Sequence, residues 1–350
     1  MKFGLAYSIQ SPTKEWSQAY DNVVEQTLLA ERLGFDSVLI SEHHLTDDGY
    51  FPSPLVVAAG LSSVTRRIRV GTAVVLVPLH HPVEVAEAAA VTDVMSRGRL
   101  ILGLGLGYRP EEFDLYNVPR RERGPRLEEG TTLIRRLLSE ENVTFSGRFY
   151  KVDKVTLTPR PVQRPPPIWI AAKFEPAIRR AARIGDAWFA DPVTPLKVLK
   201  ERNNIYLDEL KRIGRDPAML ERPLWREAYV AGSDDEAWEV AKDGVLYIYG
   251  RDYFRWGHLQ DEEGREVNPQ STSFEEFVET LRKRFIIRGV DGFIDEVEKY
   301  RREIGTNYFV FRIYFPGMRH DKALDAIRLI GTKIIPYFEE DKKPSGAGIP

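Results

Sequence analysis

Short β-rich segments alternate with amphipathic helical segments along almost the whole of this 350-residue chain. Eight segments are typical of strands, and each is followed by a stretch with a helical pattern: residues 2–8, 37–41, 68–77, 100–107, 168–172, 187–190, 224–230 and 308–313. Repeated β–α units build a parallel sheet with helices outside it. Eight units over this length favour a closed barrel over an open, doubly wound sheet. The sequence therefore predicts an α/β fold, a (β/α)8 TIM barrel with insertions.

Two stretches interrupt this alternation. Residues 142–167 contain a hairpin-like segment followed by a proline-rich one, and residues 245–288 are polar and aromatic with no clear strand partner. Neither is flanked by anything that resembles a linker between independent cores, so both are expected as insertions. We expect a single barrel domain over residues 1–340, followed by a loose C-terminal tail at 341–350.

The composition limits the partners and the chemistry. A net charge of −2 gives no electrostatic basis for binding nucleic acid or an anionic membrane surface. No apolar run approaches the roughly 20 residues of a membrane span, and the N-terminus lacks the features of a signal peptide. The absence of cysteine excludes disulfides and thiolate chemistry. A cytoplasmic protein without nucleic-acid or membrane partners is expected.

The motif EHHLTDDG, residues 42–49, directly follows the second expected strand. In a barrel this segment is a βα loop at the C-terminal face, where catalytic residues lie. Glu42, His43 and His44 would supply acid and base groups there, and the charge of histidine changes near neutral pH. The alternative is that one histidine caps a helix and the other is packed in the core.

A metal site must also be considered. His80 and His81 follow the third strand, and Asp47, Asp48 and Glu84 are expected near the same barrel face. Strand-borne ligand pairs point the same way when they are two residues apart, and neither histidine pair has that spacing. His81 is explained as a residue at a helix start. No metal is therefore expected, and a metal hydrolase is the weakest alternative.

The segment GLGLGYR, residues 103–109, does not fit a dinucleotide fingerprint in either frame. Gly103, Gly105 and Gly107 recur every second residue, so they would share one face of one strand. Glycine in a strand often marks a place where something approaches the backbone closely. A flat ring could lie against this face, or a bulky neighbouring strand could pack there, and the pattern leaves both open.

The segment WIAAKFEP, residues 169–176, runs from a strand into a helix. A helix N-terminus can hold a phosphate, and Lys173 would add a positive charge. An ordinary helix start with an exposed lysine is the alternative.

An aromatic stretch, residues 247–258, lies inside the second expected insertion. It could cover a hydrophobic substrate pocket or form a contact between subunits.

Four motifs in order carry a family resemblance: MKFG, GFDSVLISEHH, RVGTAVVLVPLHHPVEVAE and SRGRLILGLGLGYRPEEF. WIAAKFEPAIRRAARIGDAW is a weaker match. By the order and spacing of these motifs the chain resembles the bacterial luciferase family of flavin-dependent monooxygenases. The resemblance is strongest over residues 1–138 and thinner after Asp191.

The resemblance implies a two-component monooxygenase. Such an enzyme uses reduced FMN, supplied by a separate NAD(P)H flavin reductase, and O2 to oxygenate a small hydrophobic organic substrate. It also implies a homodimer. His43 matches the catalytic histidine of the family and His44 its neighbour, and Glu42 lies beside the flavin.

Further residues match cofactor-binding positions. Ala73 and Val74 match a non-proline cis peptide that lies against the ring. Gly105, Leu106, Gly107 and Tyr108 match residues around the isoalloxazine, and Ala172, Lys173 and Phe174 match the phosphate-binding turn. Tyr7, Phe254 and Trp256 are expected at the substrate pocket, whose shape depends on residues 245–288.

The chain departs from the luciferases at three positions. Gly105 and Leu106 replace a cysteine and an arginine, and Phe174 replaces a phosphate-binding serine, so light emission is not expected. Only backbone N–H groups and Lys173 would remain for the phosphate. The LGLG pattern is also common in relatives that transfer hydride with a deazaflavin coenzyme, and the EHH triplet favours FMN. A deazaflavin-dependent oxidoreductase and a non-catalytic flavin-binding protein are the alternatives.

Overall fold

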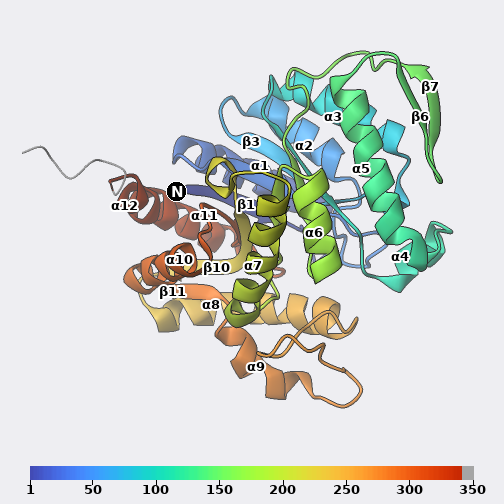
Figure 1. The fold of residues 1–350 in the computed structure, drawn as a ribbon. Coiled ribbons are helices and arrows are strands. Elements are labelled where there is room, and N and C mark those ends of the chain that lie inside the picture. The colour runs from blue at the N-terminus through green and yellow to red at the C-terminus, as the bar shows by residue number, and fades with distance from the viewer. Residues whose placement is uncertain (341–350) are drawn as a thin grey trace, which may run out of the picture.

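A computed structural model describes residues 1–340 of the chain. Eight parallel strands form its central barrel: β1 (Lys2–Tyr7), β2 (Ser37–Ile40), β3 (Arg69–Thr72), β5 (Leu100–Gly105), β8 (Ile168–Ala171), β9 (Ala187–Phe189), β10 (Pro223–Ala231) and β12 (Tyr308–Arg312). β1 pairs with both β2 and β12, and a bridge between Ala190 and Leu224 joins β9 to β10. The sheet closes on itself, so the predicted (β/α)8 barrel is confirmed (Figure 1).

Helices surround the barrel: α1 (Trp16–Arg32), α2 (Pro54–Val64), α3 (Pro82–Ser96), α5 (Arg123–Ser139), α6 (Glu175–Ile184), α7 (Leu196–Arg212), α8 (Asp234–Ile248), α10 (Val290–Ile304), α11 (His320–Leu329) and α12 (Ile335–Glu340). α3 illustrates how the sequence starts a helix. Pro82 occupies its first position, and the Nδ1 atom of His81 accepts a hydrogen bond from Val83 N. His81 therefore serves the helix start, as its position predicted.

The third and fourth strands are shorter than expected. The segment 68–77 is broken into β3 and β4 (Val75–Leu76) at Ala73–Val74, whose peptide bond is cis as the resemblance implied. β5 ends at Gly105, because the backbone turns at Gly107, which has φ +72°. A Cβ atom on Gly103 would lie 2.0 Å from the carbonyl oxygen of Thr72. Gly103 thus allows β3 to approach β5 closely.

Both interrupting stretches have structure of their own. Residues 142–167 contain the antiparallel hairpin of β6 (Val143–Ser146) and β7 (Lys151–Val155). In the second stretch α8 continues to Ile248 and is followed by the π-helix η4 (Tyr249–Phe254) and by α9 (Phe274–Arg282). β11 (Ile286–Gly289) then pairs with β10. The expectation of no strand partner in this stretch is therefore wrong at its C-terminal end, because an Ile-Ile pair forms a short buried strand there.

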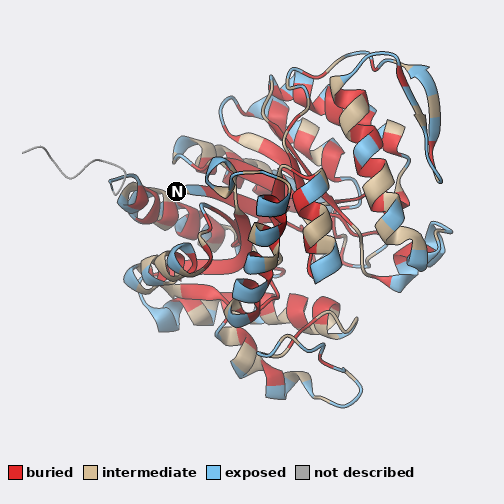
Figure 2. Ribbon diagram, viewed as in Figure 1, coloured by how far each residue is buried: buried red, intermediate tan, exposed pale blue. Residues whose placement is uncertain are grey.

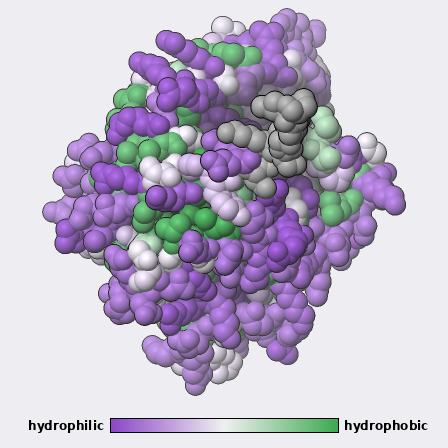
Figure 3. All heavy atoms as spheres, turned by 90° about the vertical axis from the view of Figure 1, so that its left-hand side faces the viewer, coloured by the Kyte–Doolittle hydropathy of each residue, from purple (hydrophilic) through white to green (hydrophobic). Residues whose placement is uncertain are grey.

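Two layers of apolar side chains hold the barrel together. The smaller lies inside it and includes Ala6, Leu39, Trp169, Trp225 and Val310. The larger fills the space between the strands and the helices. Figure 2 shows the central strands mostly buried and the surrounding helices with buried and exposed residues side by side. The face that carries the N-terminus and α12 is mostly hydrophilic, with small hydrophobic patches (Figure 3). Within residues 1–340 no helix is both long and apolar enough to cross a membrane. Residues 341–350, expected as a loose tail, lie outside the described residues.

Candidate active site

A cavity of about 300 Å³ opens at the carboxyl ends of the barrel strands. Its walls come from the loop after β2, from the segment of β4, from the residues after β5, β8 and β9, and from residues 253–258. Loops from several strands therefore converge on one hollow, which is where barrel enzymes place their active sites.

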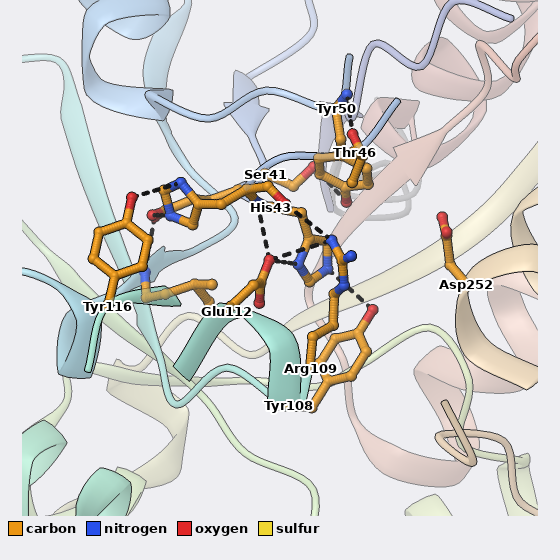
Figure 4. A network of polar contacts seen from close by, with 12 residues as sticks. Ser41, His43, Thr46, Tyr50, Tyr108, Arg109, Glu112, Tyr116 and Asp252 are labelled. Carbon is orange, nitrogen blue, oxygen red and sulfur yellow. Dashed lines mark hydrogen bonds and ion pairs between the residues drawn. The ribbon is translucent and has the colours of Figure 1, made fainter. Parts of the chain in front are cut away.

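His43 is held on the cavity wall by a carboxylate. Its Nδ1 atom lies 2.8 Å from Oε1 of Glu112, a residue of α4 (Pro110–Leu115). Its Nε2 atom lies 3.0 Å from the hydroxyl of Tyr108 (Figure 4). The edge of the imidazole meets the ring of Tyr50, with centroids 4.7 Å apart. One ring nitrogen thus faces a fixed acceptor while the other lies against the hydroxyl of a cavity residue.

Glu112 contacts three neighbouring residues of the site. Besides His43, its Oε1 atom accepts a hydrogen bond from the backbone N–H of His44 at 2.9 Å and a longer one from Arg109 at 3.4 Å. Burial alone would raise the pKa of Glu112, but these hydrogen bonds and the charge of Arg109 hold it below its usual range. The carboxylate accepts, so Nδ1 of His43 carries the proton. When the imidazole is neutral, its Nε2 atom accepts a hydrogen bond from Tyr108.

A second cluster lies beside the first. Oε1 of Glu42 is 2.6 Å from Nε2 of His44 and 2.6 Å from Nε2 of His80. Its Oε2 atom accepts a hydrogen bond from the backbone N–H of Leu76 at 2.8 Å. Burial would raise the pKa of Glu42, yet the two imidazoles lower it to about 2. The hydroxyl of Tyr116 completes the cluster at 3.0 Å from Nδ1 of His44.

The glycine segment packs closely against its neighbours. A Cβ atom on Gly103 would meet the backbone of β3, and one on Gly105 would lie 2.4 Å from the side chain of Val74. Gly105 and Gly107 also line the cavity, so the prediction that a flat ring lies against them stays a prediction. The ring of Tyr108 stacks on His258 with centroids 4.2 Å apart and planes 9° apart. Burial and the nearby charge of Lys173 lower the pKa of His258 to about 3, so this stacked imidazole is neutral.

The far end of the cavity carries more positive than negative charge, because Lys173, Arg120 and Arg123 line it together with Asp191 and Glu266. Lys173 is only 7% exposed, and its ammonium donates to the backbone carbonyl of His258. Burial lowers the pKa of Lys173 to about 8. The side chains of Arg120 and Arg123 form no hydrogen bond or ion pair of their own with another described residue. Two guanidinium groups beside a buried ammonium make this end suited to an anion.

The expected site residues fall into three groups. Most of them line the cavity: Glu42, His43, Ala73, Val74, Gly105, Leu106, Gly107, Tyr108, Ala172, Lys173, Phe174 and Trp256. His44 lies behind this wall, against Glu42 and Tyr116. Tyr7 and Phe254 are not brought to the cavity. Ala6 points into the barrel, so Tyr7 points outward among the helices, and the ring of Phe254 packs against Phe274.

Several cavity residues were not anticipated from the sequence. Tyr50, Tyr253 and His258 line the hollow, and Glu112 orients His43. The aromatic stretch thus contributes to the wall of the pocket, which was one of its two expected roles. Arg120 and Arg123 supply charge that the comparison with luciferases did not predict. Their signal in the sequence is the basic run RRERGPR, residues 120–126.

A closed α/β barrel with a buried histidine–carboxylate pair beside such a cavity is the arrangement of a barrel enzyme. The model of the family of luciferase-like monooxygenases matches residues 1–288, and the chain belongs to this family of oxidoreductases. Its relatives include flavin-dependent monooxygenases and F420-dependent oxidoreductases.

Three relatives illustrate this range. The oxygenase component of the flavin-dependent trigonelline monooxygenase of Acinetobacter baylyi is 28% identical and covers 98% of this chain and 97% of its own length. An F420-dependent glucose-6-phosphate dehydrogenase of Microbacterium testaceum is 29% identical over 89% of this chain and 92% of its own. The crystal structure of the monooxygenase RslO1 from Streptomyces bottropensis superposes with a TM-score of 0.85 at 25% identity. It covers 97% of this chain and 100% of its own.

Proposed function

We propose that this chain is the oxygenase component of a two-component flavin-dependent monooxygenase. It would take reduced FMN from a separate NAD(P)H flavin reductase and use O2 to oxygenate a small, largely apolar organic molecule. The observation that carries the proposal is a single cavity that joins an oriented imidazole, His43, to an end lined by Lys173, Arg120 and Arg123.

The residues along this cavity fit FMN. Ala73, Val74 and Gly105 offer a wall of small and apolar side chains for the ring system. Lys173, Arg120 and Arg123 would hold the phosphate, because a guanidinium group offers several donors in a planar arrangement that matches phosphate oxygens and the ammonium adds a further charge. The reduced flavin, when bound, supplies the electrons that activate O2.

His43 would act as the general acid and base of the reaction. Glu112 fixes the proton on Nδ1 of His43, so Nε2 is the atom that can take or give a proton in the cavity. The rings of Tyr50, Tyr108 and Trp256 close around the imidazole and limit the access of water.

Equilibrium binding and turnover test the proposal together. Purified protein should bind reduced FMN and, with a flavin reductase, NADH and O2, should oxygenate small apolar candidate substrates. Trigonelline, a small zwitterion, is tested beside them because the relative from Acinetobacter baylyi is named for it. Tight binding of the deazaflavin coenzyme alone would refute the assignment to FMN. Flavin binding without NADH-driven oxygenation of any candidate would instead favour a non-catalytic flavin-binding protein.

A deazaflavin-dependent oxidoreductase is the second candidate. Arg121 joins Arg120 and Arg123 around a second hollow next to the cavity. This is more positive charge than one phosphate needs, and the deazaflavin coenzyme carries further negative charge beyond its phosphate. A preference for F420 over FMN in direct competition would establish this function.

We further propose a homodimer that forms through α2 and α3. These helices pack side by side, and both carry exposed apolar side chains: Val56 and Val64 on α2, and Val91 and Met95 on α3. A helix that is apolar on its outer face is expected to be covered. Light scattering should give the mass of a dimer, and Val56→Lys combined with Met95→Lys should give a monomer. A monomeric wild-type protein would contradict this part of the proposal.

A further inference from the structure

The cluster around Glu42 has a feature that the proposed oxygenation does not use. One carboxylate oxygen and two imidazole nitrogens, from Glu42, His44 and His80, lie within 4.8 Å of one another at the cavity wall that Glu42 lines. We propose that these three side chains form a binding site for one divalent transition-metal ion of the Zn²⁺ type. The site adjoins the proposed flavin cavity through Glu42, which lines that cavity, but its ion takes no part in the oxygenation proposed above.

The geometry of the cluster suits an ion. Oε1 of Glu42 lies 2.6 Å from each Nε2 atom, and the three candidate ligand atoms all lie within 4.8 Å of one another. Among residues 1–340 this is the one group of three such side chains that converges in this way. Zn²⁺ holds His and Glu ligands at about 2.0–2.2 Å, which places the ligand atoms roughly 3.4 Å apart in a tetrahedral site. Oε1 of Glu42 would need to withdraw by less than about 1 Å from each Nε2 atom. The two Nε2 atoms, which lie no more than 4.8 Å apart, would close to the same roughly 3.4 Å.

The chemistry of the three donors also suits such an ion. Imidazole nitrogen is favoured by Zn²⁺ and its neighbours in the first transition series, and a carboxylate adds one negative charge. Leu76 N already holds Oε2 of Glu42, so Oε1 is the oxygen that faces the two imidazoles.

A partner for one ligand is already in place. The hydroxyl of Tyr116 lies 3.0 Å from Nδ1 of His44. With a metal ion on Nε2, the proton of His44 would move to Nδ1 and be donated to this hydroxyl. Metal-bound histidines characteristically make such a second hydrogen bond, which fixes the orientation of the ring.

An ion could reach the cluster without passing through the flavin cavity. The side chain of His80 is 23% exposed, and Tyr116 is exposed at the surface. The expectation of no metal rested on the spacing of the histidine pairs. The spacing of two does occur here, between Glu42 and His44, with a carboxylate in place of the first histidine. In the ion-free state the two imidazoles donate to Glu42, so occupied and empty sites differ in where the protons lie.

Metal titration of the full chain tests the proposal. Protein freed of metal with a chelator is titrated with ZnCl₂ by calorimetry, and the zinc retained after gel filtration is measured by mass spectrometry. We expect one Zn²⁺ per chain, and visible absorption bands of a four-coordinate site when Co²⁺ replaces it. His80→Ala removes a ligand and should abolish stoichiometric binding. His81→Ala is the matched control, since this exposed neighbour lies outside the cluster, and it should bind as the wild type does.

A milder variant keeps the test valid if His80→Ala does not fold. Tyr116→Phe removes only the hydroxyl that supports His44, and it should weaken Zn²⁺ binding by about tenfold. Binding well below one ion per chain would overturn the proposal. So would stoichiometric binding that survives His80→Ala, or equal affinity in the wild type and Tyr116→Phe.

Discussion

Replacing Lys173 by methionine should weaken the binding of FMN more than it weakens the binding of riboflavin. The two ligands share the ring system, and riboflavin lacks the phosphate. Methionine has nearly the length of lysine and no charge, so the substitution removes the ammonium from the cavity while much of the packing is kept. The comparison therefore isolates the contact between Lys173 and the phosphate.

The magnitude follows from the surroundings of Lys173. A hydrogen bond to a charged group contributes about 1.5–3 kcal/mol, which corresponds to a change in Kd of roughly 10- to 150-fold. Arg120 and Arg123 stay in place, so a loss near the lower end, about tenfold, is expected for FMN. Lys173→Met also leaves the carbonyl of His258 without its donor. This cost is the same for both ligands and cancels in the ratio of their Kd values.

Quenching of flavin fluorescence at pH 7 measures both affinities. Lys151→Met on β7 is a control, because this exposed lysine is remote from the cavity lining, and it should leave both Kd values unchanged. An unchanged ratio of the FMN and riboflavin Kd values in Lys173→Met would refute the assignment of the phosphate end. If both Kd values rise by the same factor, the lysine serves only the shape of the pocket.

Three further results are expected. Because burial lowers the pKa of Lys173 to about 8, its ammonium is lost as the pH rises through 8, and FMN should bind more weakly above pH 8. Lys173→Met should show no such dependence on pH. An affinity of the wild type for FMN that stays constant from pH 7 to 9 would contradict this. Glu112→Gln should lower turnover by about 100-fold with little change in substrate KM, because the charge that orients His43 is lost. Turnover within twofold of the wild type would show that the pair of His43 and Glu112 does not take part in catalysis. Gly103→Ala should lower the free energy of unfolding in urea by at least about 2 kcal/mol, since its Cβ would lie 2.0 Å from the backbone oxygen of Thr72. Gly292→Ala in α10 is the control, because its Cβ would make ordinary contacts at 3.4 Å. It should leave the free energy of unfolding unchanged or raise it by up to about 1 kcal/mol.

The barrel and the position of His43 could be predicted from the sequence, because both depend on local order along the chain. Alternating β and α patterns define the strands, and a residue directly after a strand must lie at its carboxyl end. The direction in which a single side chain points is harder to predict from the sequence. All but the first residue of β1 are buried, so periodicity does not show whether Ala6 or Tyr7 faces the barrel interior. Tyr7, which was expected at the substrate pocket, points outward among the helices.

The partner of His43 shows a second limit. Glu112 lies 69 residues further along the chain, in a short helix whose start at Pro110 is readable. Glu111 and Glu112 are chemically equivalent in the sequence, and only the packing of that helix on the barrel decides which carboxylate is buried. Glu112 is 2% exposed, while Glu111 faces the solvent. An acid–base pair between residues far apart in the sequence can therefore be identified only when the packing of their elements is known.

The charged end of the cavity depends on how one basic run is paired. In the sequence, Glu122 stands among four arginines and would be expected to neutralise its neighbours. In the structure it forms its closest ion pair with Arg126, one helical turn away, and a longer one with Arg148. The side chains of Arg120 and Arg123 consequently form no ion pair with Glu122. Under the proposed binding of FMN, the replacement of a luciferase serine by Phe174 is offset by positive charge from Arg120 and from Arg123, the first residue of α5. A Glu122→Gln variant, which leaves both arginines untouched, should bind FMN at least as tightly as the wild type.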